Sequence, residues 1–353
     1  MNQKLMKKSL ITLAVLGAFA GAAQAQAPAT VVTLYGSFDG GIRNVSNANT
    51  NGDSVTTMGS NGTYNSNRIG FKGTEDLGGG NNAHFNLETG FNTGTGALDN
   101  ANNQLFSRTA TVGMGGSWGS IDLGRQYTVA FRIIATYDPF NYKYTGILPP
   151  VGATAGVRNN NDIQYAGTFG GITARAEWAL GEVVGNNNSG STKAIGVGYS
   201  AGPITVGAAH TEKKPGNLDY KNDTIGGAYK MGPMRVAVGY TKDKQNAATT
   251  ATTGNTTKKD VWVGGSFDVT PAATITLAYY KIDLTRDSTV RATGDKKLVM
   301  LGGTYAMSKR TNLYADVDQS KYSTGTNNTL ATPATIKGDK KVNGISIGMN
   351  HTW

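Results

Sequence analysis

The chain has 353 residues, includes 49 glycines and no cysteine, and carries 33 basic against 23 acidic side chains. The lack of cysteine excludes disulfides and thiolate metal sites, and the basic side chains form no stripe with interleaved aromatic residues of the kind that binds nucleic acid. Glycine, asparagine and threonine are abundant and leucine is scarce, which favours β structure over long amphipathic helices.

The first 25 residues have the pattern of a secretory signal peptide. Three lysines precede an apolar stretch at about residues 10–23, and an A-x-A cleavage site ends at Ala25. The stretch is too short and too rich in alanine and glycine for a transmembrane helix, which needs about 17 to 25 strongly apolar residues. We therefore expect residues 1–25 to be removed and residues 26–353 to form one exported domain.

Segments in which apolar and polar residues alternate recur along the mature chain. In residues 31–43, for example, Leu34 and Phe38 share one face and Tyr35 and Asp39 share the other. This period of two residues predicts β-strands with one apolar and one polar face. We count about sixteen such strands. Their predicted starts lie near residues 31, 67, 83, 106, 120, 158, 172, 193, 204, 223, 234, 260, 274, 297, 312 and 342.

Short and long connections alternate between the predicted strands. Turns such as AGP, MGP, VTPA and MSKRT are interleaved with long polar stretches at residues 47–65, 242–259, 283–295 and 320–340. One-sided loop lengths, strands of about ten residues and aromatic residues near strand ends are typical of outer-membrane β-barrels. An even number of strands places both termini and the short turns of such a barrel in the periplasm.

The alternative fold is a secreted β-sandwich or adhesin, which also has alternating strands. We favour a transmembrane barrel for two reasons. The polar face of the predicted strands is unusually rich in glycine, serine and threonine. Closing a barrel pairs every strand and leaves no edge, which is the only way that strands persist in lipid.

One connection, at residues 128–157, is too long and too apolar for a surface loop. Structureless loops beyond about fifteen residues are usually functional. We expect this one to fold into the lumen, with its polar side facing the pore and its apolar side packed on the barrel wall. The apolar residues concerned are Ile133, Ile134, Phe140, Ile147 and Leu148.

Four motifs and the aromatic C-terminus are specific in combination. The motifs are SNRIGFKGTEDLGGG at 66–80, IDLGRQ at 121–126, GVRNNNDIQY at 156–165 and MSKRTNLYADVD at 307–318. Together they resemble the general porins of β-proteobacteria over essentially the whole mature chain. The resemblance implies a homotrimeric, sixteen-stranded outer-membrane channel for the passive diffusion of small hydrophilic solutes and ions, with no cofactor. It also implies that residues 128–157 are the third loop, which forms the pore constriction.

The same resemblance implies a basic cluster on the wall opposite that loop, as in anion-selective members of the family. The matching positions are Arg68, Arg108 and Arg158. Alternation places Arg68, Lys72 and Arg158 on the lumen face. Arg108 shares its alternation with Val112, which would aim its side chain at lipid unless a bulge intervenes.

The balance of charge at the constriction predicts a moderate preference for anions. Residues 128–157 contain one acid, Asp138, against Arg132 and Lys143, and stacked guanidinium groups in a narrow pore attract anions and oppose cations. The lumenal acids that would soften this preference are Glu88, Asp39 and Glu177. The weaker candidates for lumen-facing arginines are Arg43, Arg125 and Arg175. The alternative is that the arginines are ordinary solvated residues with no collective effect.

No catalytic or metal site is predicted. GGSWG at 115–119 matches the G-x-S-x-G pattern but joins two predicted strands, whereas a nucleophile elbow joins a strand to a helix. The histidines His84, His210 and His351 lack metal-binding spacing. A barrel enzyme of the outer membrane remains the alternative to a porin, but the expected Ser/His or Asp/His pairing is missing from the sequence.

The last strand is predicted to close the barrel. Ile345 and Ile347 alternate with Ser346, and the chain ends on Trp353, which suits the aromatic belt at a membrane interface. The family ordinarily ends on phenylalanine, and the resemblance implies that this residue is read by the barrel-assembly machinery. The other expected partners are outer-membrane lipid and lipopolysaccharide.

Overall fold

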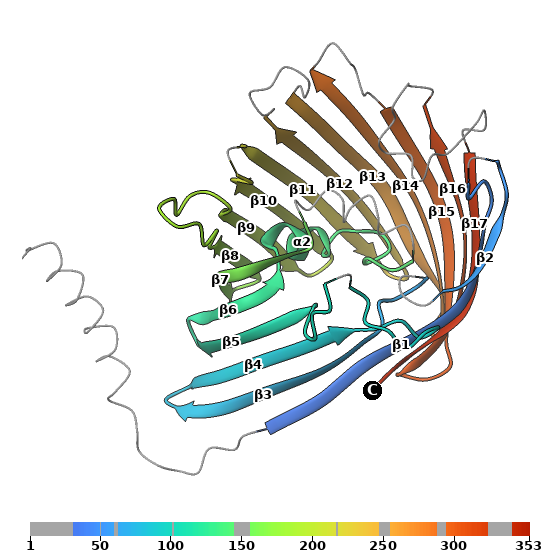
Figure 1. Cartoon of the computed structure of the whole chain (residues 1–353). Helices are drawn as coiled ribbons and strands as arrows, with labels where there is room; N and C mark the ends of the chain where they lie inside the picture. The colour runs from blue at the N-terminus through green and yellow to red at the C-terminus, as the bar shows by residue number, and fades with distance from the viewer. Residues whose placement is uncertain are drawn as a thin grey trace, which may run out of the picture.

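The computed structural model shows seventeen strands in one antiparallel sheet that closes on itself. The structure describes residues 31–353 except 50, 60–62, 101, 145–155, 217, 247–254, 288–293 and 324–340. The short strand β2 (Val55–Gly59) pairs with the end of β1 inside the first long connection, and the other sixteen strands form the wall of the barrel in Figure 1. The predicted fold class is therefore confirmed, while the predicted signal peptide lies outside the described residues.

The wall strands follow the order of the chain. They are β1 (Val31–Val45), β3 (Arg68–Gly78), β4 (Asn81–Gly90), β5 (Thr109–Gly116), β6 (Gly119–Tyr127), β7 (Arg158–Phe169), β8 (Ile172–Ala179), β9 (Thr192–Ala201), β10 (Ile204–Lys213), β11 (Tyr220–Met231), β12 (Met234–Gln245), β13 (Asn255–Thr270), β14 (Ala273–Asp287), β15 (Gly294–Ala306), β16 (Thr311–Tyr322) and β17 (Lys341–Thr352). The largest departure from the predicted starts is at β13, because ladder pairing continues into the polar residues where the apolar alternation ends.

The barrel closes where β17 pairs with β1, in the register from Ser37 opposite Thr352 to Val45 opposite Gly344. The other edge of β1 pairs with β3 and β2, so β1 has a neighbour on both sides. The ring of Trp353 stacks on the ring of Phe38 with centroids 4.3 Å apart. Both ends of the described chain lie with the short turns, at what we call the turn end; the opposite end is the loop end (Figure 1).

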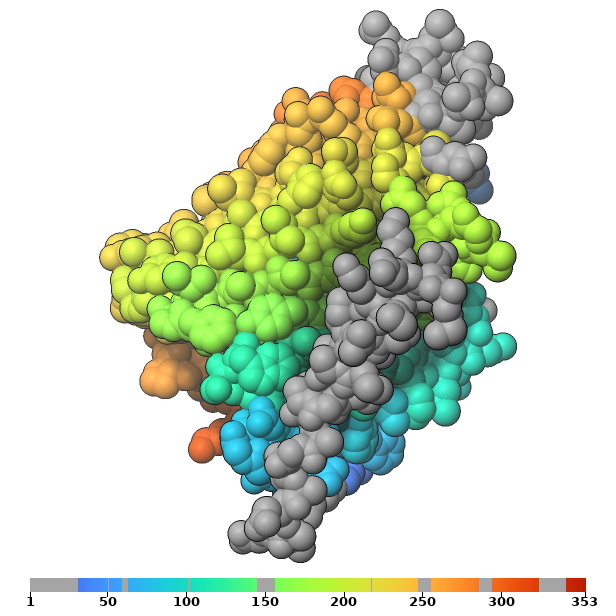
Figure 2. Space-filling model, turned by 90° about the vertical axis from the view of Figure 1, so that its left-hand side faces the viewer, coloured from blue at the N-terminus to red at the C-terminus, as the bar shows by residue number. Residues whose placement is uncertain are grey.

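Side chains sort by strand alternation into an apolar outer surface and a polar lumen. On β17 the outward Ile345 and Ile347 are 56% and 65% exposed, whereas the inward Ser346 is 1% exposed. Figure 2 shows the outer surface of part of the wall, where neighbouring strands follow each other in chain order. An outward apolar belt of this kind is the surface that a barrel presents to lipid. No helix in the described part of the chain has the length and apolar character to cross a bilayer.

The hydrophobic core lies inside the barrel, beneath a segment that folds into the lumen. This inward segment, residues 128–144, contains the helix α2 (Val129–Ile134), which packs on β9 and β10 (Figure 1). The predicted apolar residues Ile133, Ile134 and Phe140 are buried, as expected for a loop packed on the wall. Ile147 and Leu148 lie outside the described residues.

Glycines on the wall allow the inward segment to approach closely. A Cβ atom at Gly226 on β11 would lie 2.4 Å from Cδ2 of Tyr137, and one at Gly196 on β9 would lie 2.6 Å from Cγ1 of Val129. Side chains at these positions would occupy the space that the segment fills. The glycines at these wall positions thus allow the segment to dock.

Candidate functional site

The inward segment begins with a fixed first turn. The Thr128 hydroxyl accepts a hydrogen bond from the backbone N–H of Phe131 at 3.2 Å, as an N-cap does. The N–H of Val129 donates to Oε2 of Glu177 on β8 at 2.9 Å. Glu177, predicted as a lumenal acid that softens anion preference, is instead buried and holds the start of α2.

Further along, the segment is tied to successive wall strands. The hydroxyl of Tyr137 lies 2.8 Å from that of Thr224 on β11, and the hydroxyl of Tyr144 donates to the carbonyl of Gly303 on β15 at 2.8 Å. The strands β8 to β16 thus form an anchoring wall beneath the segment. The lumen sides of β1 and β3 to β7 form a facing wall across the remaining opening.

The structure places Asp138 away from that opening. Its side chain is completely buried, with Oδ1 accepting from the Tyr280 hydroxyl and Oδ2 from the N–H of Tyr142, both at 2.8 Å. Burial raises the pKa of Asp138 to about 6, and these hydrogen bonds oppose the rise. This differs from the prediction, because the one acid of the segment is a docking residue and leaves the lumen side of the segment to basic groups.

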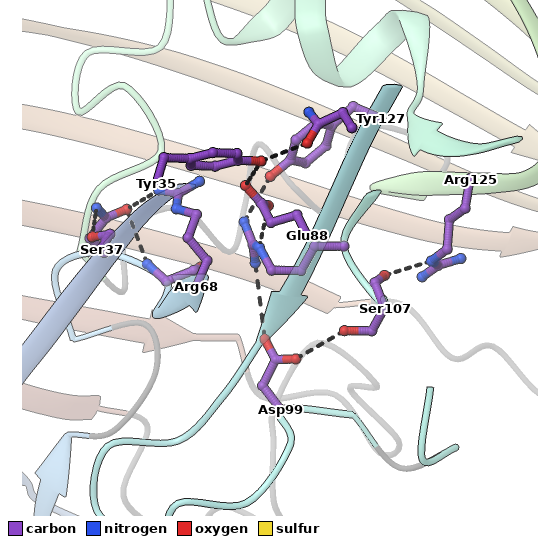
Figure 3. A network of polar contacts seen from close by, with 12 residues as sticks. Tyr35, Ser37, Arg68, Glu88, Asp99, Ser107, Arg125 and Tyr127 are labelled. Atoms are coloured by element: carbon purple, nitrogen blue, oxygen red, sulfur yellow. Dashed lines mark hydrogen bonds and ion pairs between the residues drawn. The ribbon is translucent and has the colours of Figure 1, made fainter. Parts of the chain in front are cut away.

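On the facing wall, Arg108 forms a buried ion pair with Glu88, which is labelled in Figure 3; Nε of Arg108 and Oε1 of Glu88 are 2.7 Å apart. Arg108 also donates to the Tyr127 hydroxyl at 2.9 Å, and the Tyr35 hydroxyl donates to Glu88 at 3.0 Å. Arg108 lies in a bend before β5 begins, so the strand alternation that would aim its side chain at lipid does not apply. Arg108 therefore reaches the lumen, with its charge balanced by Glu88.

The other predicted cations of this wall contact neutral groups. Arg68 donates to the amide oxygen of Asn65 at 2.9 Å, and Lys72 lies over the ring of Tyr35, with Nζ 5.6 Å from its centroid. The guanidinium carbon of Arg158 lies 4.2 Å from the centroid of the Tyr127 ring. An aromatic face or an amide holds a cation in place without cancelling its charge.

Two cations of the inward segment complete the site from the other side. Lys143 lies over the ring of Tyr64, with Nζ 5.4 Å from its centroid, and the guanidinium carbon of Arg132 lies 5.7 Å from the Tyr127 centroid. Burial lowers the pKa of Lys143 to about 8, and the charge of Arg68 adds to this effect. Lys143 is therefore electrostatically coupled to a cation of the facing wall.

A cavity of ≈ 350 Å³ runs along the facing wall beside this cluster. Its lining includes Lys72, Glu88, Tyr127 and Arg132. The cations Arg68, Lys72, Arg132, Lys143 and Arg158 are called the basic cluster below. Within the described residues none of these five forms an ion pair.

Asp39, the second acid that was expected to reduce the anion preference, is also buried. It is 1% exposed and accepts hydrogen bonds from the backbone N–H groups of Tyr64, at 2.9 Å, and of Asn65. The Tyr314 hydroxyl donates to its other oxygen at 2.5 Å. The three acids expected to oppose the arginines are therefore either buried by docking contacts or paired with Arg108.

The weaker arginine candidates have separate positions. Arg43 lies in the lumen and pairs with Asp318 at 2.7 Å and with Asp316 at 3.6 Å. Arg175 shares the inward side of β8 with Glu177. Arg125 differs from the prediction, because it stands in register with the outward Ala110 and donates to the Ser107 carbonyl at 2.5 Å (Figure 3).

Sequence reasoning did not assign the aromatic residues that position the cations. Alternation places Tyr35 on the lumen face, so its contact with Lys72 on the neighbouring strand can be predicted from that pattern. Tyr127 and Tyr64 lie at or beyond strand ends, where alternation gives no direction. Among the described residues no cluster of acidic and histidine side chains is arranged to hold a metal ion. His84 instead contacts Asp122 at 2.9 Å.

A closed antiparallel barrel with an apolar outer belt, a polar lumen and a segment folded across that lumen defines a channel of the outer-membrane type. Residues 12–325 match the model of the Gram-negative porin family. An outer membrane porin protein of Bordetella pertussis is 31% identical over 364 residues, which are 88% of this chain and 93% of that protein. Outer membrane porin protein 32 of Delftia acidovorans is 31% identical over 377 residues, which are 99% and 100% of the two chains.

Solved structures agree with this result. An anion-selective porin from Comamonas acidovorans superposes with a TM-score of 0.78 at 25% identity, over 92% of this chain and 100% of that one. A trimer form of OmpT from Vibrio cholerae superposes with a TM-score of 0.71 at 18% identity, which supports the fold alone. The chain belongs to the Gram-negative porin family, and it is a protein of the outer membrane.

Proposed function

We propose that this porin is a passive diffusion channel for small hydrophilic solutes and ions that prefers anions. The constriction lies between the inward segment and the facing wall. The observation that carries the proposal is the choice of partners in the basic cluster, whose five cations rest on aromatic rings or an amide. Of the acids in the same region, Asp39, Asp138 and Glu177 are buried and Glu88 is paired with Arg108. Asp122 lines the cavity beside Arg132 and offsets part of the positive charge, which leaves the cations in excess.

The size of the anion preference can be estimated from the Coulomb energy between one permeating ion and one cation of the cluster. Two unit charges about 6 Å apart interact by about 0.7 kcal/mol in water, which is about threefold in local concentration. Partial dehydration in a narrow pore strengthens the interaction. Several uncancelled cations together therefore give a clear preference for anions over cations.

The relatives support the same proposal. The solved structure at 25% identity is described as an anion-selective porin, and the fold is shared with an outer membrane protein found in a trimer form. We propose that this chain is also a homotrimer. We further propose that residues 1–25 are a cleaved signal peptide, that Trp353 is the assembly signal, and that the barrel-assembly machinery and lipopolysaccharide are partners.

Planar bilayers with purified mature protein test the proposal. We expect stepwise conductance in groups of three. Exchange of K⁺ for a bulky organic cation should leave most of the conductance, and exchange of Cl⁻ for a bulky organic anion should abolish most of it. The reverse order would contradict the anion preference, and the absence of any conductance would contradict the channel.

A further inference from the structure

The strands β2 and β3 pair with the same edge of β1 and are separated by a connection. Pairing of β1 with β2 ends at Gly41 opposite Gly59, and pairing with β3 ends at Ser37 opposite Arg68. The chain between Gly59 and Arg68 is therefore much longer than the gap on β1 that it passes. Its described part, residues 63–67, lies on the lumen side of β1. We call these five residues the inner arm.

The inner arm is fixed to β1 at Asp39. Oδ2 of Asp39 accepts hydrogen bonds from the backbone N–H groups of Tyr64, at 2.9 Å, and of Asn65. The N–H of Asp39 donates to the amide oxygen of Asn67 at 2.5 Å, and its carbonyl accepts from the Thr93 hydroxyl at 2.9 Å. Among the described residues no strand pairs with Asp39 on this edge, so these side chains satisfy the backbone groups that the interruption leaves open.

Tyr64 connects the inner arm to the inward segment. Its ring stacks on the ring of Tyr314, with centroids 4.8 Å apart, and meets the ring of Tyr144 edge to face, also at 4.8 Å. Its carbonyl oxygen accepts a hydrogen bond from the N–H of Tyr144 at 2.8 Å, and Nζ of Lys143 lies 5.4 Å from its ring centroid. Tyr64 therefore contacts the inward segment through both its backbone and its ring.

The last described residues of the inward segment have a backbone that depends on such contacts. Asn141, Tyr142 and Tyr144 have φ values of 51°, 58° and 63°, a left-handed conformation that residues other than glycine keep only where the surrounding structure imposes it. These residues flank Lys143. The Tyr144 hydroxyl is bound to Gly303 on the anchoring wall, and its N–H is bound to the inner arm. The turn that carries Lys143 is thus held by the wall and by the arm together.

We propose that the inner arm is a second element of the constriction and that Tyr64 is the positioning residue for Lys143. The inference rests on the proposed function, in which residues 128–157 form the constriction. Without the Tyr64 ring, Lys143 loses its aromatic support and the turn that carries it loses part of its packing. The inner arm therefore contributes to both the width and the charge of the opening.

The charge state of Lys143 reports whether the Tyr64 ring covers it. Burial is the largest cause of the lowered pKa of Lys143, which is about 8. The charged groups that face Lys143 are Arg68 and Arg108, which lower the pKa further, and Asp39, which raises it. The variant Y64S leaves all three in place. Water in place of the ring would hydrate the ammonium group and raise its pKa.

Planar-bilayer recordings of Y64S, Y64F and Y322S test the proposal. Tyr322 provides the matched control, because its ring also supports a lysine, with Nζ of Lys296 5.6 Å from its centroid. In Y64S we expect single-channel conductance to change by at least about 1.5-fold, and the pH at which anion preference declines to rise by at least about half a pH unit. Y64F, which keeps the ring, and Y322S should match the wild type in both measurements.

Wild-type conductance and an unchanged pH dependence in Y64S would overturn the proposal, as would equal changes in Y64F or Y322S. Circular dichroism verifies that the barrel has folded, and Y64Q replaces Y64S if the smaller side chain prevents folding. Conductance does not depend on the sign of the preferred ion. A wild-type channel that prefers cations would therefore contradict the proposed function, while the conductance of Y64S would still decide the role of the inner arm.

Discussion

The two walls of the lumen are made of the same kind of strand but carry different side chains. The anchoring wall presents glycines, such as Gly226, and hydroxyl groups that receive the inward segment. The facing wall presents cations held by Tyr35 and Tyr127. In the proposed constriction, the anchoring wall therefore positions the segment that limits the width of the pore, and the facing wall carries Arg68, Lys72 and Arg158 of the basic cluster. The following predictions separate these two roles.

Overfilling the anchoring wall should have the largest effect. In G226L the new side chain meets Tyr137, and overpacking of this kind costs about 1 to 3 kcal/mol. We expect the segment to leave the wall and single-channel conductance to change by at least about twofold. The control is G303L, since a Cβ there meets only a carbonyl oxygen at 3.8 Å. Wild-type conductance in G226L would mean that the segment does not set the pore width.

Removing charge from the basic cluster should change selectivity and leave the width almost unchanged. For the triple variant R68Q, K143Q and R158Q we expect the permeability ratio of anions to cations to fall about tenfold, at about threefold or less for each cation. Reversal potentials measure this ratio. The control variant carries K221Q, K242Q and K259Q, which removes three charges outside the lumen. An equal shift in both variants would place the selective charges elsewhere.

The low pKa of Lys143 predicts a pH step. The group is charged below its pKa of about 8 and neutral above it, so anion preference should decline as the pH rises from 7 to 9, by about threefold or less. In K143R the step should vanish, because arginine stays charged throughout this range. The same step in K143R, or none in the wild type, would show that Lys143 does not act on the permeating ions.

Replacing the buried acid of the inward segment should have the smallest effect on selectivity. In D138N an amide group cannot accept both hydrogen bonds, from Tyr280 and from the N–H of Tyr142, which leaves a buried donor unpaired at a cost of about 1 to 3 kcal/mol. We expect lower thermal stability in detergent and a smaller change in reversal potential than in K143Q. A larger change than in K143Q would mean that Asp138 faces the ions, as the sequence alone implied.

Periodicity predicted most of the fold, because apolar alternation is imposed on every strand that meets lipid on one side and water on the other. The inward segment was also predictable, since Ile133, Ile134 and Phe140 need a place away from water. The detailed positions of the site residues could not be predicted from the sequence. Arg108 turns inward at a bend before its strand, and Asp138 is covered by Tyr280, which follows it by 142 residues.

The central claim is that uncancelled cations at the constriction favour anions. The most direct test is the reversal potential of the wild-type channel in a planar bilayer under a tenfold KCl gradient at pH 7. We predict a potential with the sign set by the Cl⁻ gradient. A potential with the sign set by K⁺, or none, would contradict the account.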